Sequence, residues 1–151
     1  MNSDPSGAYI GIILLIYVVA AVFALLVFVA VYVVTALALM QFFRKVGVEP
    51  WIAWVPVYAH WKWLEVGGQP GALSLLVLVP YAGIVTSVFL AIGMYRTGIA
   101  FRKDPSWVVL GIFLPWVWLF LLGRQSEVYQ PELITAAGYP PPRAGYGSVP
   151  A

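Results

Sequence analysis

The sequence has no cysteine, a single histidine and few charged residues, and each shortage excludes a class of chemistry. Without cysteine there is no disulfide, thiolate nucleophile or cysteine metal site. One histidine cannot supply a metal cage of several imidazoles. Charged residues make up 9% and hydrophobic residues 62% of the chain, against about 25% and about 45–50% in soluble globular proteins. A soluble globular enzyme is therefore excluded, and we expect no cofactor or metal.

Charged side chains are missing from three windows, residues 5–43, 66–95 and 105–123. A helix needs about 20 apolar residues to cross the hydrocarbon core of a membrane. We therefore expect an all-α integral membrane protein with three transmembrane helices. The expected organisation is an N-terminal segment and long first helix over 1–43, a Trp-rich segment over 44–71, a second helix over 72–95, a basic loop over 96–105, a third helix over 106–123 and a tail over 124–151.

The first apolar segment is longer than a membrane requires. Residues 12–43 contain neither Gly nor Pro, so nothing in the sequence breaks the helix. Such a helix is roughly 48 Å long, against a hydrocarbon core of roughly 30 Å. A tilt of about 50° would be needed to fit it, which is beyond the usual range. The apolar side chains of the surplus turns, over residues 36–43 or 9–17, must therefore be shielded from water by another part of this chain, by lipid headgroups or by a partner.

The segment from 44 to 71 is apolar but interrupted, and it is rich in tryptophan. Indole rings settle at the headgroup level, where the ring is buried and the N–H finds a polar partner. We therefore expect residues 51–66 to form an interfacial or re-entrant helix, with a fourth membrane span as the alternative. The interfacial side chains are Trp51, Trp54, Trp61, Trp63, Lys62 and Glu65.

Three prolines are expected to break helices: Pro56, Pro80 and Pro115. Proline removes one backbone donor and crowds the preceding turn. The last two lie at equivalent points of similar segments, each ten residues after another proline, Pro70 or Pro105. Because the second and third spans would run antiparallel, this pair resembles the broken inverted repeats of transporters.

Small residues recur every fourth position on the second expected span, at Gly83, Ser87 and Ala91. Ala20 and Ala24 offer a matching face on the first. Small side chains allow helix backbones to approach closely inside a membrane. We expect these residues to pack helices together, either within one copy or between copies.

The distribution of Lys and Arg sets the expected orientation. With three spans, five basic residues share one side and three the other, which favours an outside N-terminus and a cytoplasmic C-terminus. The first group is Arg44, Lys45, Lys62, Arg124 and Arg143, and the second is Arg96, Arg102 and Lys103. The Pro-rich tail from residue 124 is expected to be disordered and partly polyproline II.

Short motifs between residues 44 and 129 carry a resemblance to a known family. They are Lys45-Val-Gly47, Trp51, Val55-Pro56-Val57-Tyr58, Gly68-Gln-Pro70, Val79-Pro80, Ala100-Phe101-Arg102-Lys103, Leu122-Gly123 and Tyr129. This pattern resembles a family of small bacterial inner-membrane proteins of unknown function. It is also similar to the membrane stretch that precedes the catalytic domain of some bacterial signal peptidases. The resemblance implies a multi-pass protein of the inner membrane.

No template for catalysis fits the sequence. The titratable cluster is His60, Lys62 and Glu65, of which the last two face each other on a helix and predict an interfacial ion pair. No serine has a base at a recognisable nucleophile spacing. We therefore expect a non-enzymatic accessory or scaffold subunit that contacts membrane lipids and other integral membrane proteins or copies of itself, and no nucleic acid. The alternative is a small transporter or channel formed by a homo-oligomer.

Overall fold

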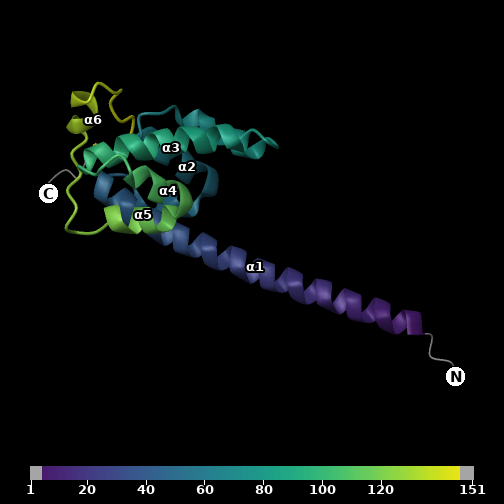
Figure 1. Cartoon of the computed structure of the whole chain (residues 1–151). Coiled ribbons are helices and arrows are strands. Elements are labelled where there is room, and N and C mark those ends of the chain that lie inside the picture. Colours follow the sequence, from purple (N-terminus) through teal and green to yellow (C-terminus); the bar gives the residue numbers. More distant parts are fainter. Residues whose placement is uncertain (1–4, 147–151) are drawn as a thin grey trace. The chain divides into compact units, whose positions relative to one another are not determined.

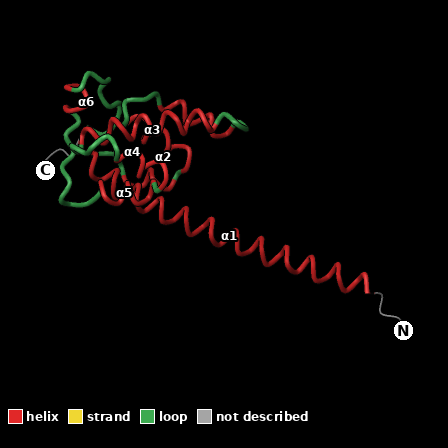
Figure 2. The backbone as a smooth tube through the Cα atoms, viewed as in Figure 1, coloured by secondary structure: helices red, strands yellow, loops and turns green. Residues whose placement is uncertain are grey.

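The chain folds into helices joined by short loops (Figures 1 and 2). The computed structural model describes residues 5–146, and within that range there are helices and no strand, as the all-α class predicts. The α-helices are α1 (Pro5–Val46), α2 (Pro56–Val66), α3 (Gly83–Ala100), α4 (Trp107–Phe113), α5 (Pro115–Leu122) and α6 (Glu132–Ala136). Two 3-10 helices, η1 (Pro50–Trp54) and η2 (Gly71–Leu78), precede α2 and α3.

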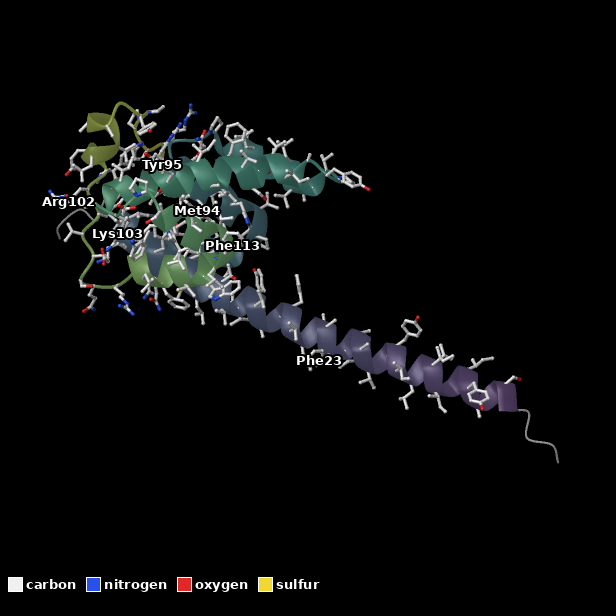
Figure 3. The ribbon with its side chains drawn as sticks, viewed as in Figure 1. Phe23, Met94, Tyr95, Arg102, Lys103 and Phe113 are labelled. Carbon is white, nitrogen blue, oxygen red and sulfur yellow. The ribbon has the colours of Figure 1, made fainter. Side chains whose placement is uncertain are left out.

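The chain divides into two compact units, residues 1–34 and residues 35–151, and α1 contributes to both. In the first unit every described side chain from Ser6 onward to Val31 is exposed, and most of them are apolar. Phe23, for example, is 68% exposed (Figure 3). Two helices are long and apolar enough to cross a membrane by length and composition, Ser6–Val46 of α1 and Gly83–Ala100, which is α3.

The last three turns of α1 belong to the core of the second unit. Ala38, Leu39, Phe42, Phe43 and Val46 are all buried there. They recur at the three- and four-residue spacing that places side chains on one face of a helix. Burying each phenylalanine contributes about 1.5–3 kcal/mol. The apolar turns over residues 36–46 are therefore covered by this chain itself, whereas the side chains from Ser6 to Val31 stay exposed.

Aromatic rings from distant segments meet at the centre of the second unit. The ring of Phe42 lies 6.3 Å from that of Phe101 and 5.9 Å from that of Trp118, both in tilted arrangements. Ring centroids 4.5–7 Å apart in such orientations are favourable beyond the area that they bury. The contact joins α1, the end of α3 and α5 into one core.

Pro56 starts a helix instead of interrupting one. The N–H of Val55 donates to the carbonyl of Ile52 at 3.0 Å, which closes η1, and Pro56 then occupies the first turn of α2. Proline fits there because its missing N–H would have no intrahelical partner. Residues 51–66 are therefore two short helices that meet at Val55, and the carbonyl of Ile52 keeps a backbone donor next to the proline.

The expected second span is a helical hairpin. η2 ends at Leu78, the chain turns through Pro80, and α3 begins at Gly83 and packs against η2. Thr86 on α3 donates its hydroxyl to the carbonyl of Leu73 at 2.7 Å, so it bonds across the hairpin instead of to its own helix. The segment thus folds back on itself, and its α-helix runs to Ala100 instead of ending at residue 95.

The expected third span is also folded back. α4 ends at Phe113, Leu114 has a non-helical backbone, and α5 begins at Pro115 and packs against α4. A Cβ on Gly111 would lie 3.3 Å from the indole of Trp118, whereas a straight helix would separate these residues by about 10 Å along its axis. Seven- and eight-residue helices are roughly 10–12 Å long and cannot cross the hydrocarbon core singly.

Polar contacts join two loops that the three-span arrangement places on opposite sides of a membrane. Lys103 forms an ion pair with Glu127 at 2.8 Å, and Arg102 donates to the side-chain amide oxygen of Gln130 at 2.8 Å. Figure 3 shows the two basic residues beside the chain that follows α5. Residues 96–105 and 124–131 therefore contact each other in this fold, and a membrane crossing by residues 106–123 is not shown.

The tail differs from the expected disordered chain up to residue 146. Residues 132–136 form α6, and the N–H of Arg143 donates to the carbonyl of Glu65 at 2.7 Å. The phenol of Tyr129 donates to the carbonyl of Gly145 at 2.9 Å, and burial raises the pKa of this phenol. These specific hydrogen bonds hold residues 132–146 against the rest of the second unit. The amino-acid composition of the tail does not reveal them. Residues 147–151 lie outside the described part of the chain.

Candidate functional site

The Trp-rich segment carries a compact polar cluster on α2. Lys62 and Glu65 form an ion pair at 2.8 Å, at the i, i+3 spacing that places them on one helix face. Trp61 donates its indole N–H to the other oxygen of the same carboxylate at 2.7 Å. The hydrogen bond that Lys62 donates to Glu65 raises the pKa of Lys62 above its ordinary value, against a smaller opposing effect of burial. Both charges are thus held within the half-buried surface of the helix.

The four tryptophans of this segment divide between surface and core. Trp51 and Trp54 are exposed, Trp61 is half-buried, and Trp63 is buried in the core. Trp63 shares the inner face of α2 with Ala59 four residues before it, which explains its burial. An interfacial position is therefore open to the first two rings and closed to Trp63, whose expected interfacial role is corrected.

His60 takes no part in the polar cluster. Its Nδ1 lies 2.7 Å from the carbonyl oxygen of Pro56, and its ring is 6.3 Å from that of Trp63. A carbonyl only accepts, so Nδ1 is the donor, and the neutral imidazole presents Nε2 as an acceptor. The expected titratable cluster is therefore the Lys62–Glu65 ion pair alone, and His60 lies on the opposite face of α2.

His60 borders an apolar cleft between α3 and the α4–α5 bend. The cleft has a volume of about 490 Å³. Its polar groups are His60, Thr35 and Ser87; the hydroxyl of Ser87 already donates to the carbonyl of Gly83 at 3.1 Å. Apolar side chains supply the rest of the wall: Trp63, Ile84, Val88, Leu90, Ala91, Met94, Gly111, Ile112 and Pro115. An apolar hollow of this size with few polar groups is typical of small-molecule sites.

The face of small residues on α3 opens onto this cleft. Ser87 is exposed, and Gly83 and Ala91 are half-buried. Ser87 and Ala91 line the cleft together with Gly111 and Ile112 of α4, and the described residues do not show close packing of this face inside one copy. Packing between copies stays a prediction. Ala20 and Ala24 are exposed on α1.

The closest helix contact involves glycines that the sequence pattern did not single out. A Cβ on Gly67, at the end of α2, would lie 2.4 Å from the Cα of Gly93 on α3. A Cβ on Gly71 would lie 2.2 Å from the indole of Trp61. Because each pair joins separate elements, no repeat within one helix marks it. Only the Gly-Gly and Pro-Gly runs at 67–71 hinted at a close approach.

Reactive side chains are not gathered anywhere in the described part of the chain. Among residues 5–146 no group of three His, Asp or Glu side chains could hold a metal ion. The buried hydroxyl of Thr97 donates to the carbonyl of Gly93 at 2.8 Å, one turn back on α3. A hydroxyl engaged in this way stabilises its helix and has no adjacent base to activate it.

The comparisons with known proteins identify a family without a known activity. No curated protein and no solved structure matches the chain. The model of a family of unknown function, DUF5684, matches residues 51–132, from η1 through the first residue of α6. This range includes the polar cluster of α2, both proline bends and most of the apolar cleft. Because the match covers 82 of the 151 residues, the chain belongs to the DUF5684 family.

Proposed function

We propose that this protein is a non-enzymatic subunit of the bacterial inner membrane that binds other membrane proteins through α1. The observation that carries the proposal is the continuous exposed apolar surface of α1 from Ser6 to Val31. Exposed apolar area of this extent marks a surface that meets lipid or another protein. In the described part of the chain no group of three His, Asp or Glu side chains could hold a metal ion.

The length of α1 favours a protein partner over lipid alone. Residues 6–35 precede the buried turns and extend roughly 45 Å, against a hydrocarbon core of roughly 30 Å. The surplus of roughly 15 Å would otherwise require an unusually large tilt. A neighbouring membrane helix packed along α1 would cover it.

The two hairpins support an arrangement in which the rest of the chain lies on one side of the membrane. Arg96 donates to the carbonyl of Gly67 at 3.5 Å, so both ends of the η2–α3 hairpin lie together. The Lys103–Glu127 ion pair does the same for the α4–α5 bend. With α1 as the crossing helix, all eight Lys and Arg residues then share one side. The positive-inside rule makes that side the cytoplasm and puts the N-terminus outside.

In this arrangement the two proline turns dip their apolar tips into the membrane surface. Leu78, Tyr81 and Ile84 are exposed at the first turn, and Ile112 and Phe113 at the second. Trp51 and Trp54 suit the headgroup layer. The similar stretch in signal peptidases would then be a shared membrane module, which carries no peptidase activity here.

The partner is tested by purification in lipid nanoparticles followed by mass spectrometry. Ala20→Leu with Ala24→Leu fills the small face of α1 and keeps the helix apolar, so membrane insertion is retained while close packing is blocked. Val18→Leu with Val22→Leu makes the matched change on the opposite face. We expect a stoichiometric partner with the wild type and the control, and its loss with the alanine variants.

The transporter alternative makes a different prediction in the same experiment. It requires a pure homo-oligomer that passes solute when reconstituted in liposomes, with the bends at Pro80 and Pro115 lining the path. That result would replace the scaffold proposal. A chain that purifies alone and as a monomer would refute both.

The orientation is tested with single cysteines, since the chain has none of its own. We place them at Gly7, where nothing lies within 4 Å of an added Cβ, and at exposed Ser126. A thiol reagent that cannot cross the membrane should label Gly7→Cys and spare Ser126→Cys on intact cells. Labelling of Ser126→Cys alone would reverse the orientation.

A further inference from the structure

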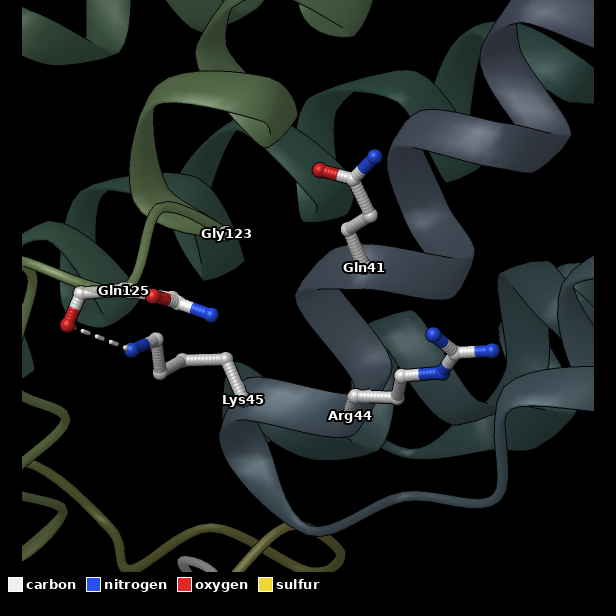
Figure 4. A pocket seen from close by; sticks show the side chains of 5 residues that line it. All are labelled: Gln41, Arg44, Lys45, Gly123 and Gln125. Carbon is white, nitrogen blue, oxygen red and sulfur yellow. Dashed lines mark hydrogen bonds between the residues drawn. The ribbon is translucent and has the colours of Figure 1, made fainter.

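A polar pocket lies where α1 ends beside the loop that follows α5 (Figure 4). It has a volume of about 470 Å³ and is lined by Gln41, Arg44, Lys45, Gly123 and Gln125. Every long side chain around it carries N–H donors, and none of the lining residues is acidic. The pocket is therefore equipped to bind an anion.

The pocket is built by the close approach of two elements. A Cβ on Gly123 would lie 3.2 Å from the Cβ of Gln41 and 3.1 Å from the carbonyl oxygen of Leu119. Glycine thus lets the end of α5 meet α1 without a side chain between them. Lys45 then donates to the carbonyl of Gln125 at 3.3 Å, which holds the loop as the opposite wall.

The positive charge at this pocket is not neutralised by an ion pair among residues 5–146. The ion pairs of residues 5–146 are Lys62–Glu65 and Lys103–Glu127, and neither involves the pocket. The guanidinium of Arg44 lies 3.9 Å from the thioether sulfur of Met40, a weak acceptor. Lys45 also borders a neighbouring hollow that contains Glu127. Arg44 is therefore an exposed cation at this pocket that forms no ion pair among residues 5–146.

We propose that the pocket binds a phosphate group, either the phosphodiester of an anionic lipid headgroup or free phosphate. A guanidinium offers paired N–H donors that match phosphate oxygens, and the lysine and two amides add donors around it. Basic groups next to a membrane-spanning helix attract anionic headgroups in the same way.

The place of Arg44 along α1 fits a lipid headgroup. Arg44 follows Leu37, the last exposed apolar residue of the helix, by seven residues or roughly 10 Å. The headgroup layer extends roughly 5–8 Å beyond the hydrocarbon on each side, so the long side chain of Arg44 can reach back to it. The lipid source rests on the proposed membrane location, whereas the anion site itself does not.

Native mass spectrometry of the full chain in detergent tests the site. The probes are phosphatidylglycerol and phosphatidylcholine with identical acyl chains, and inorganic phosphate as a competitor. We expect the wild type to retain phosphatidylglycerol preferentially. Arg44→Gln with Lys45→Gln should weaken that binding by about 30-fold, since each basic group near an anionic surface contributes on the order of fivefold. Arg102→Gln removes an exposed charge elsewhere and should leave binding unchanged.

A second variant separates binding from helix stability, because Arg44 and Lys45 also complement the negative end of α1. Gln125→Glu leaves α1 intact, adds a negative charge to the pocket and should also abolish the preference. In a second possible outcome the wild type binds phosphate, the variants do not, and no lipid is preferred. That result would support the anion site, identify free phosphate as its ligand and contradict the membrane placement. Absence of anion binding, or equal loss in Arg102→Gln, would overturn the proposal.

Discussion

Gly67 lies where even a methyl group would collide with the backbone of a neighbouring helix. Alanine at this position would place its Cβ 2.4 Å from the Cα of Gly93, well inside the 3.5–4.0 Å of a normal carbon contact. The obstacle is backbone, so α2 and α3 must separate by more than 1 Å. The φ of Gly67 is −78°, which alanine adopts freely, so steric conflict alone decides the outcome.

We expect Gly67→Ala to destabilise the second unit by about 1–2 kcal/mol. Overpacking costs about 1–3 kcal/mol, and the lower chain entropy of alanine returns about 0.4–1 kcal/mol. Thermal unfolding in mild detergent, followed by tryptophan fluorescence, should show a Tm lowered by about 3–8 °C.

Gly93→Ala is the matched control, made on the other side of the same contact. Its Cβ would lie 3.5 Å from the Cα of Gly67, an ordinary contact, and alanine favours the helix by up to about 1 kcal/mol. Its Tm should equal or exceed that of the wild type. Equal losses in both variants, or an unchanged Tm for Gly67→Ala, would refute the close crossing of α2 and α3.

Two further predictions concern hydrogen bonds and charge. Thr86→Val should lower the free energy of unfolding by about 1–3 kcal/mol, because the carbonyl of Leu73 loses its side-chain donor. The control Ser87→Ala changes an exposed residue and should alter the free energy of unfolding by less than about 0.5 kcal/mol. Equal effects of the two substitutions would contradict the hairpin. The raised pKa of Lys62 means that its pairing with Glu65 stabilises the fold fully below pH 10.5 and less as the pH rises above it. The stability difference between wild type and Lys62→Met should therefore shrink in alkaline solution, and a constant difference would contradict the pairing.

Local features of the sequence indicated the all-α class and three of the breaks between helices. Pro56, Pro80 and Pro115 lie at helix boundaries because the restrictions of proline act on its own backbone and the turn before it. The Lys62–Glu65 pair follows in the same way from spacing on one helix.

The direction of the chain after each proline was not predictable from the sequence. A long apolar segment with a central proline suits a kinked membrane span as well as a hairpin. What distinguishes them here are contacts between residues far apart, such as Thr86 with Leu73 and Lys103 with Glu127. The docking of the tail through Arg143 and the covering of Phe42 and Phe43 depend on such contacts too, and periodicity within one helix cannot report them.

Photo-crosslinking in living cells tests most directly whether α1 binds another membrane protein. A photoreactive amino acid replaces Phe23, which borders the face of Ala20 and Ala24, or Val22 on the opposite face. We expect a discrete protein adduct from position 23 and lipid adducts alone from position 22. Lipid adducts alone from both positions would contradict the account and leave α1 as a membrane anchor only.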